Sequence, residues 1–187
     1  MSIARRSVFA LLASLPFASR LAAQPPVQVP PPDGAPETLE PTALAKANVA
    51  TLRRYYDKFN AHDIDGAILF FSEDTRNHGR PVGRPGLRRV LTDLTTMFPD
   101  YKHELVEITA AGDVVISRNK VSGTHKGVGK IPVEGGFLVG VAPTERAFSV
   151  QHIHWWRFRD GLIVEHYACR DDLDMMQQLG LMAPKVG

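Results

Sequence analysis

The stretch after Pro99 constrains the fold most, because it contains β-rich segments joined by short turns and little else. Strands are typically rich in β-branched and aromatic residues and are bounded by turn residues. Asp160-Gly161, between the last two segments, is a typical two-residue hairpin turn. The second half of the chain therefore predicts long antiparallel strands in sequential order. The four segments are HELVEI, DVVISRNKVSGTH, ERAFSVQHIHWWRF and LIVEHYACR.

Two amphipathic helices are predicted before these strands. Apolar residues recur at three- and four-residue steps from Leu44 to Phe59, so the first helix should end between Asn60 and Asp65. An apolar stripe from Leu87 to Phe98 predicts a second helix, which Pro99 closes. Between them, SEDTRNHGRPVGRPG is predicted to form turns, and DLDMMQQLGLM near the end of the chain to form a short helix or turn.

Helices followed by a run of strands predict an α+β domain whose curved antiparallel sheet wraps around the helices. Such an arrangement leaves a conical cavity at one end, and a cavity of this kind is a natural site for a small molecule. We expect this domain over residues 42–183.

The beginning of the chain predicts export. Residues 1–23 resemble a signal peptide, because Arg5-Arg6 precede an apolar run that is too short to span a bilayer. The signal is of the twin-arginine or the general secretory kind, so we expect a periplasmic or secreted protein. Residues 24–41 contain seven of the fourteen prolines and are expected to form a disordered tether. The single cysteine, Cys169, leaves no internal disulfide possible.

Charge and hydropathy argue against two classes of partner. The net charge is +2, and no run of Lys and Arg is dense enough to follow a phosphate backbone, so we expect no nucleic acid. We also expect no membrane span.

Two histidines lie in the most apolar of the predicted strands. Because side chains alternate along a strand, His152 and His154 share a face with Phe148, Val150 and Trp156. Imidazoles on an apolar face that lines a cavity can orient a base, hold a carbonyl oxygen or move a proton. The alternative is that both are core histidines with satisfied hydrogen bonds.

A His-x-His pair on a strand can also present two nitrogen ligands to a metal. Metal-binding barrels place a carboxylate soon after such a pair, whereas here the next four residues are WWRF. We therefore expect no metal.

Several short motifs resemble the SnoaL-like polyketide (ester) cyclase family of the NTF2-like superfamily. The resemblance extends from Ala45 to Leu181, with Asn77-His78 and Phe98-Pro99-Asp100 upstream of the strands. The later motifs are Gly123-Thr124-His125, Pro143-Thr144, Arg157-Phe158-x-Asp160-Gly161-x-Ile163-x-Glu165-His166-Tyr167, Asp171-Asp172-Leu173 and Gln177-Gln178-Leu179-Gly180.

The resemblance implies a cone-shaped α+β fold and a cofactor-free enzyme. Members close a ring by intramolecular aldol condensation, using an acid–base aspartate near the end of the sheet. That aspartate aligns with Asp171 or with Ala168, and in the second case this chain lacks it. Asp171 is our candidate base, and its alternative role is to cap the helix that follows.

The other candidate site residues are mostly aromatic. His152 and His154 join Asp171 as catalytic candidates. The substrate-binding candidates are His125, His78, Tyr56, Phe59, Trp156 and His166. Two departures from the family pattern, the long link 126–142 and Glu145 in place of a glycine, are expected near the mouth of the cavity.

Three functional hypotheses follow. The first is an exported enzyme of the cyclase or isomerase type, which uses acid–base catalysis on a small hydrophobic carbonyl compound, polyketide-like or an ester. The second is a non-catalytic module that carries a hydrophobic ligand in the same cavity. The third is an oligomerisation or interaction domain, because cone folds often pair through the open face of the sheet. That face would carry Gln151, Trp155 and Arg157, so we expect a homodimer.

Overall fold

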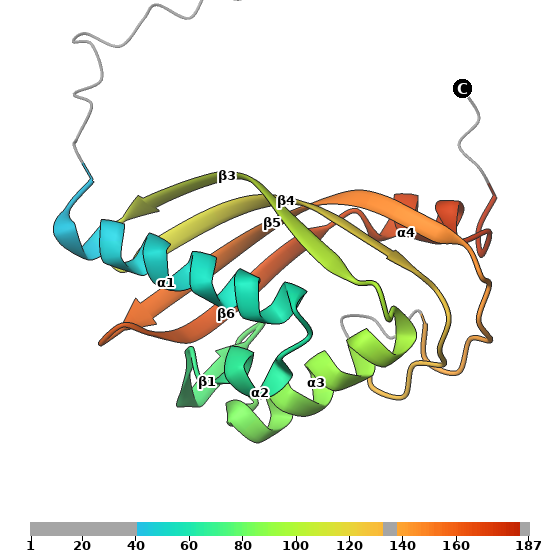
Figure 1. Ribbon diagram of the computed structural model, residues 1–187, viewed down its shortest axis with the longest axis horizontal. Helices are drawn as coiled ribbons and strands as arrows, with labels where there is room; N and C mark the ends of the chain where they lie inside the picture. The colour runs from blue at the N-terminus through green and yellow to red at the C-terminus, as the bar shows by residue number, and fades with distance from the viewer. Residues whose placement is uncertain (1–40, 133–137, 184–187) are drawn as a thin grey trace, which may run out of the picture. The chain divides into compact units, whose positions relative to one another are not determined.

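The fold is organised around one curved, unclosed sheet of six strands in the order β2-β1-β6-β5-β4-β3 (Figure 1). The computed structural model describes residues 41–132 and 138–183. The predicted export signal and all but the last residue of the predicted tether lie outside the described residues.

Four long strands follow the prediction closely. They are β3 (Lys102–Ala111), β4 (Val114–Thr124), β5 (Ala147–Arg159) and β6 (Leu162–Arg170). Each pairs antiparallel with the next. At the turn between β5 and β6, Asp160 and Gly161 have φ values of 53° and 75°, as a two-residue hairpin turn with both central residues left-handed requires.

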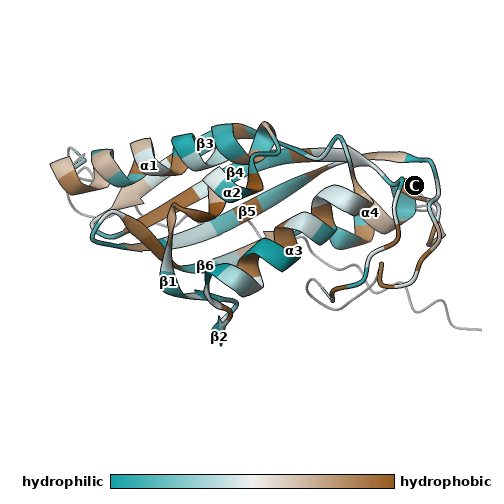
Figure 2. Ribbon diagram, turned by 60° about the horizontal axis from the view of Figure 1, so that its bottom comes forward, coloured by the Kyte–Doolittle hydropathy of each residue, from teal (hydrophilic) through white to brown (hydrophobic). Residues whose placement is uncertain are grey.

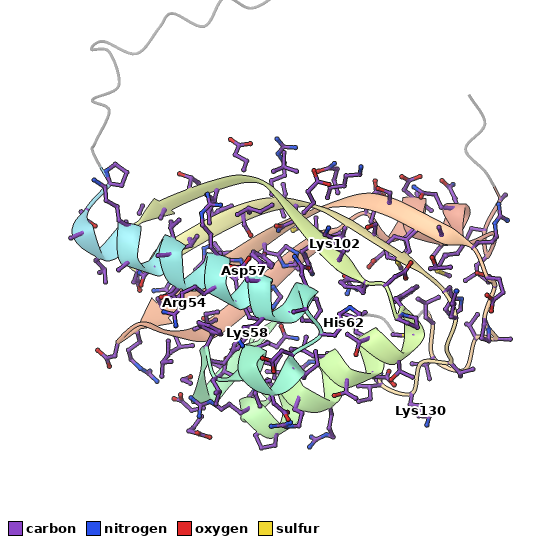
Figure 3. All side chains as sticks on the ribbon, viewed as in Figure 1. Arg54, Asp57, Lys58, His62, Lys102 and Lys130 are labelled. Atoms are coloured by element: carbon purple, nitrogen blue, oxygen red, sulfur yellow. The ribbon has the colours of Figure 1, made fainter. Side chains whose placement is uncertain are left out.

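The two predicted amphipathic helices are present, the segment predicted as a short helix or turn near the end of the chain is a helix, and one further short helix, α2 (Ile64–Ile68), was not predicted. The described helices are α1 (Ala43–Asn60), α2 (Ile64–Ile68), α3 (Gly83–Met97) and α4 (Asp172–Gln178). The Thr42 hydroxyl caps α1 by accepting a hydrogen bond from the Ala45 amide at 3.1 Å. The charged residues Arg54, Asp57 and Lys58 lie on the exposed face of α1 (Figure 3).

The expectation that residues 72–86 form only turns is wrong. Phe71–Asn77 is strand β1, and Arg80–Pro81 is the short strand β2 beside it. The polar sequence of β1 hides it, but it pairs parallel with β6, a segment almost ninety residues later. A strand that is stabilised by such a distant partner needs no apolar alternation of its own.

The core lies between the sheet and the helices. Burial alternates along β5, where Phe148, Val150, His152, His154 and Trp156 are all buried, as the strand periodicity predicted. Figure 2 shows that α1 and α3 each carry hydrophobic and hydrophilic residues along their length, and both contact the sheet. The α+β prediction with helices packed on a curved sheet is therefore confirmed. No helix in the described part of the chain is long and apolar enough to cross a membrane.

Candidate functional site

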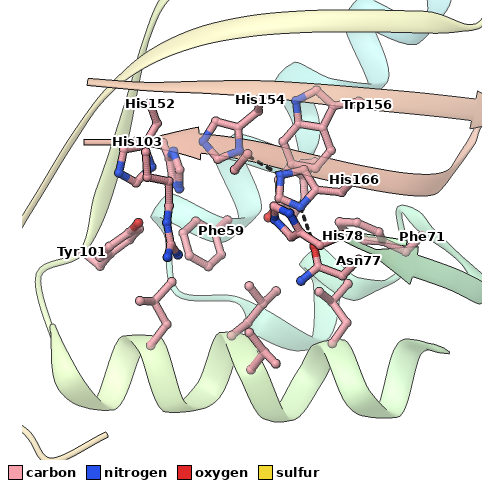
Figure 4. A pocket seen from close by; sticks show the side chains of 17 residues that line it. Phe59, Phe71, Asn77, His78, Tyr101, His103, His152, His154, Trp156 and His166 are labelled. Carbon is pink, nitrogen blue, oxygen red and sulfur yellow. Dashed lines mark hydrogen bonds between the residues drawn. The ribbon is translucent and has the colours of Figure 1, made fainter. Parts of the chain in front are cut away.

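A small cavity of about 70 Å³ lies between the inner face of the sheet and helices α1 and α3. Apolar side chains of α3 form one wall, and the opposite wall consists mainly of histidines and aromatic residues from the strands (Figure 4). The lining residues are Tyr55, Phe59, Phe71, Asn77, His78, Leu87, Val90, Leu91, Leu94, Tyr101, His103, His152, His154, Trp156, His166, Ala168 and Arg170.

The register between β5 and β6 determines which side chains lie next to one another in the wall of the cavity that contains the histidines. His152 lies opposite Arg170, His154 opposite Ala168, and Trp156 opposite His166. Residues that lie opposite each other in an antiparallel pair point to the same face of the sheet. Because side chains alternate along β5 and β6, these three cross-strand pairs all point to the same face of the sheet and line the cavity.

Two hydrogen bonds connect Asn77, His166 and His154 in a chain (Figure 4). His166 Nδ1 lies 2.8 Å from Asn77 Oδ1, and its Nε2 lies 2.8 Å from His154 Nδ1. The planes of the two imidazoles differ by only 16°, which suits a hydrogen bond between ring nitrogens.

This chain determines where the protons lie. With the amide oxygen of Asn77 facing the ring, His166 donates from Nδ1, and because burial keeps the ring neutral, its Nε2 is the acceptor. His154 therefore donates from Nδ1 and keeps a lone pair on Nε2. That nitrogen is buried and has no hydrogen-bond partner within the protein. The arrangement presents one basic nitrogen of defined tautomer at the cavity wall.

The surroundings keep these imidazoles neutral. Burial, followed by the nearby histidines and Arg170, holds the pKa of His154 and of His166 well below the usual 6.5. Burial and Arg170 lower the pKa of His152 to about 3. Burial and His152 do the same for the pKa of His103. A neutral imidazole has one donor and one acceptor, so the wall offers both kinds of hydrogen bond at ordinary pH.

His103 is a site residue that the sequence analysis missed. It lies on β3, and its ring centroid is 5.2 Å from that of His154 and 6.3 Å from that of His152. The segment HELVEI was predicted to be a strand, so the signal was a histidine on a strand face. Only the fold shows that this face meets the histidines of β5. Arg170 and Tyr101 were missed for the same reason, as was the wall that α3 provides.

Six of the predicted site residues line the cavity. They come from α1, from β5, from β6 and from the turn between β1 and β2. They are Phe59 on α1, His152, His154 and Trp156 on β5, His166 on β6 and His78 in the turn. Trp156 also donates a hydrogen bond from Nε1 to Ser117 Oγ at 3.1 Å, which fixes the indole against the sheet.

Two predicted substrate-binding residues lie outside the cavity. The Tyr56 hydroxyl is 3.0 Å from Ser117 Oγ and accepts a hydrogen bond from Asn119 Nδ2 at 3.1 Å, so it belongs to a buried polar network. Burial raises the pKa of Tyr56 above its usual value. His125 is fully buried against Phe98, and its Nδ1 accepts a hydrogen bond from the Thr144 amide at 3.3 Å. Both side chains support the fold around the site and do not line it.

Asp171 also lies away from the cavity. It is exposed, and its carboxylate accepts a hydrogen bond from the Asp174 amide at 3.0 Å, which caps α4. The sequence left catalysis and capping open, and the geometry is that of the cap. Ala168, by contrast, lines the cavity opposite His154. None of the described residues that line the cavity is a carboxylate.

Neither Glu145 nor the described residues of the link 126–142 line the cavity. Among the described residues of the link, Lys130 and Ile131 donate backbone hydrogen bonds to the buried carboxylate of Asp93 on α3. Glu145 has φ 57°, and its amide donates to the His125 carbonyl at 3.0 Å. These contacts join the described part of the link to α3 and Glu145 to His125, and their place near the mouth of the cavity stays a prediction.

Solved structures with the same fold are numerous. IdmH from Streptomyces antibioticus, a candidate polyketide cyclase, is 30% identical with a TM-score of 0.58, over 71% of this chain and 98% of that one. A candidate SnoaL-like polyketide cyclase from Jannaschia sp. CCS1 is 21% identical with a TM-score of 0.65, over 78% and 99%. AclR from Streptomyces galilaeus, a candidate hydroxylase, is 24% identical with a TM-score of 0.60, over 74% and 98%.

These neighbours carry different activities in their names, so the fold alone does not decide the reaction. No curated protein matches the chain. The family model of the SnoaL-like polyketide cyclases matches residues 49–179, which include every strand and all of the cavity wall. The chain therefore belongs to the SnoaL-like polyketide cyclase family.

Proposed function

We propose that this protein is a cofactor-independent enzyme that moves protons on a small carbonyl compound, with His154 as the acid–base residue. Family membership supports a function of the cyclase or isomerase type. The observation that carries the proposal is the chain from Asn77 through His166, which leaves the Nε2 lone pair of His154 buried at the cavity wall. The proposal includes export of the enzyme, as the first 23 residues predict.

The reaction would begin when His154 Nε2 takes a proton from a carbon next to the carbonyl group. The electron pair of that C–H bond forms the C=C bond of an enolate, and the π pair of the carbonyl group moves onto its oxygen. The enolate oxygen then needs a hydrogen-bond donor. His103 is placed to donate, since its ring centroid lies 5.2 Å from that of His154 and its buried Nδ1 has no hydrogen-bond partner within the protein. The carbanion attacks a second carbonyl in a cyclase or takes back a proton at another carbon in an isomerase. In either case the His154 imidazolium returns the proton.

Burial weakens His154 as a base in the free protein, because the imidazolium is poorly solvated there. The developing enolate changes this, since a negative charge close to the ring favours the protonated form. Stabilisation that arises only as the charge develops lowers the barrier and not merely the energy of the bound substrate. The neutral resting cavity therefore fits this chemistry.

The test is proton exchange. We expect the protein to catalyse deuterium incorporation from D₂O into the carbon next to the carbonyl of 2-butanone, followed by NMR. His154→Gln should slow the catalysed exchange about 10²–10⁴-fold, the usual contribution of a general base. His125→Gln is the matched control, because it removes a buried histidine outside the cavity. An unchanged rate in His154→Gln would remove this residue from the mechanism.

The second candidate function is a non-catalytic carrier of a small hydrophobic ligand. It is favoured by Ala168, which stands in the cavity at a position where members of the family often have an aspartate. Mass spectrometry of molecules retained by the purified protein separates the two functions. A ligand that is recovered unchanged after long incubation, together with no exchange into 2-butanone, would establish the carrier.

A further inference from the structure

The described side chains that line the cavity bring a positive charge and no negative charge. Arg170 is the only charged side chain among the described residues that line the cavity. It lies at the end of β6, opposite His152 in the sheet register, and 16% of its side chain is exposed. Its Nη2 donates a hydrogen bond to Asp172 Oδ2 at 3.0 Å, but Asp172 does not line the cavity. A bound molecule therefore meets a positive charge at this end of the cavity and no negative one from the wall.

His152 adds hydrogen-bonding groups beside that charge. Its side chain is 3% exposed, and neither of its ring nitrogens has a hydrogen-bond partner within the protein. A neutral imidazole has one N–H that needs an acceptor. A ligand oxygen at this place would accept from His152 while it lies next to the Arg170 guanidinium. Such charge-assisted hydrogen bonds are about twice as strong as neutral ones.

The size and the opposite wall describe the rest of the ligand. Pockets for drug-sized ligands measure roughly 300–1,000 Å³, whereas this cavity measures about 70 Å³. The α3 wall, with Leu87, Leu91 and Leu94, is apolar. The cavity therefore suits a compound of few heavy atoms with one polar end and a short aliphatic part.

We propose that the ligand is a small monoanion, a short-chain oxo acid whose carboxylate lies between Arg170 and His152. Its enolisable carbon would then lie at His154, two residues along β5, and its aliphatic part against α3. The placement of the reacting carbon rests on the proposed function, whereas the placement of the carboxylate does not. This substrate class is smaller than a fused-ring polyketide and, unlike an ester, is charged.

Binding of butyrate and butyramide tests the carboxylate site, because the two probes have nearly the same shape and differ in charge. We expect butyrate to bind the full chain at least tenfold more tightly than butyramide in NMR titrations. Arg170→Met should abolish this preference, and Arg170→Lys should retain part of it, since a lysine keeps the charge without the planar fork. Asp172→Asn is the matched control, because it removes the ion pair of Arg170 and keeps the cation. It should bind butyrate at least as well as the unaltered protein.

Equal affinity for the two probes in the unaltered protein, or a full preference for butyrate in Arg170→Met, would overturn the inference. Because the first comparison needs no variant, the test stands even if Arg170→Met folds poorly. The outcome is also distinct from that of the exchange experiment. A preference for butyrate without exchange into 2-butanone would support an anion-binding carrier, and exchange without the preference would leave the enzyme and reject the oxo acid.

Discussion

At the scale of single residues, the side chain of Asn77 orients the hydrogen-bonded pair His166 and His154, which burial keeps neutral. Its amide oxygen can accept a hydrogen bond from His166 but brings no negative charge. An aspartate at this place would hold the same ring and would also favour an imidazolium. Burial, followed by the nearby histidines and Arg170, keeps His154 unprotonated well below the pH at which an exposed histidine is half protonated, and the amide adds no charge that opposes this. Asn77 is therefore a positioning residue for His154.

Replacing Asn77 tests this role through the pH profile. The exchange rate of the unaltered protein should stay level as the pH falls from 8 through 6.5, because the low pKa of His154 keeps it in its basic form. In Asn77→Asp the carboxylate should raise the pKa of both rings, so the rate should begin to fall at a higher pH. Asn77→Leu loses a hydrogen bond of about 1 kcal/mol, which should reduce the rate roughly five- to tenfold. Identical profiles for Asn77→Asp and the unaltered protein would show that Asn77 does not act through the rings.

The sequence predicts a site residue when its orientation depends only on alternation within a single strand. Strand alternation alone placed His152, His154 and Trp156 on one face, and that face lines the cavity. His103 and Arg170 were out of reach, because their place depends on the register between strands. Tyr56, His125 and Asp171 were also predicted in the site, but the sequence does not show that each has a hydrogen bond elsewhere.

At the scale of elements, α4 depends on a single cap. Asp171 precedes its first turn and accepts a hydrogen bond from the Asp174 amide. The helix has only seven residues, so it cannot hold itself together by its own backbone bonds. Gln178 joins it to β5 by accepting from the Ser149 amide at 2.7 Å and donating to the Ser149 carbonyl at 3.1 Å. Cap and anchor together hold α4 beside the end of the sheet.

Asp171 therefore belongs to stability and not to the chemistry of the cavity. We expect Asp171→Ala to lower the free energy of unfolding by about 1 kcal/mol, the usual value of such a cap, and Asp171→Asn to retain most of it. The exchange rate into 2-butanone should be unchanged in both variants at a temperature where they are folded. Urea unfolding and the exchange assay provide the two readouts. A large loss of exchange in Asp171→Asn with normal stability would return this residue to the catalytic candidates.

The elements themselves were largely predictable, because four strands and two helices carry strong periodicity. Strand β1 was not, and the cause is its neighbour. It pairs with β6 through parallel register at Arg76 and Asn77, and its side chains Ser72 and Thr75 are buried although they are polar. This misassigned strand also carries Asn77, so the missing element and the missing positioning residue have one physical cause.

At the scale of the whole molecule, the outer face of the sheet carries exposed apolar side chains. Ile116, Trp155 and Tyr167 lie in one row across β4, β5 and β6. Ile153, which is 50% exposed, lies on the same face. Apolar residues gathered on one exposed face often mark a protein–protein contact. This is the face through which we expect the homodimer to form.

Light scattering after gel filtration tests the dimer. The protein should elute with twice the mass of one chain, and Ile153→Lys should shift it towards the monomer, because a charge in an apolar interface is poorly solvated. Leu69→Lys is the matched control, since Leu69 is 61% exposed but lies after α2, away from the sheet face. A monomer in the unaltered protein, or an unchanged dimer in Ile153→Lys, would contradict the expectation.

The buried histidines make the stability of the whole domain depend on pH. Burial lowers the pKa of His103 and of His152 to about 3 in the folded protein, whereas an unfolded histidine has a pKa near 6.5. Below about pH 6.5 the unfolded chain therefore takes up protons that the folded chain does not, so the free energy of unfolding falls as the pH falls. Each such imidazole lowers the free energy of unfolding by about 1.4 kcal/mol per pH unit, and small domains have only about 5–15 kcal/mol in total.

Urea unfolding followed by tryptophan fluorescence should show a steep loss of stability from pH 6.5 to 4.5. The variant His152→Gln should lose stability less steeply, since one titrating group is gone. A free energy of unfolding that stays level over this range would mean that His103 and His152 are solvated in the folded protein. The burial that keeps His154 neutral would then be contradicted as well.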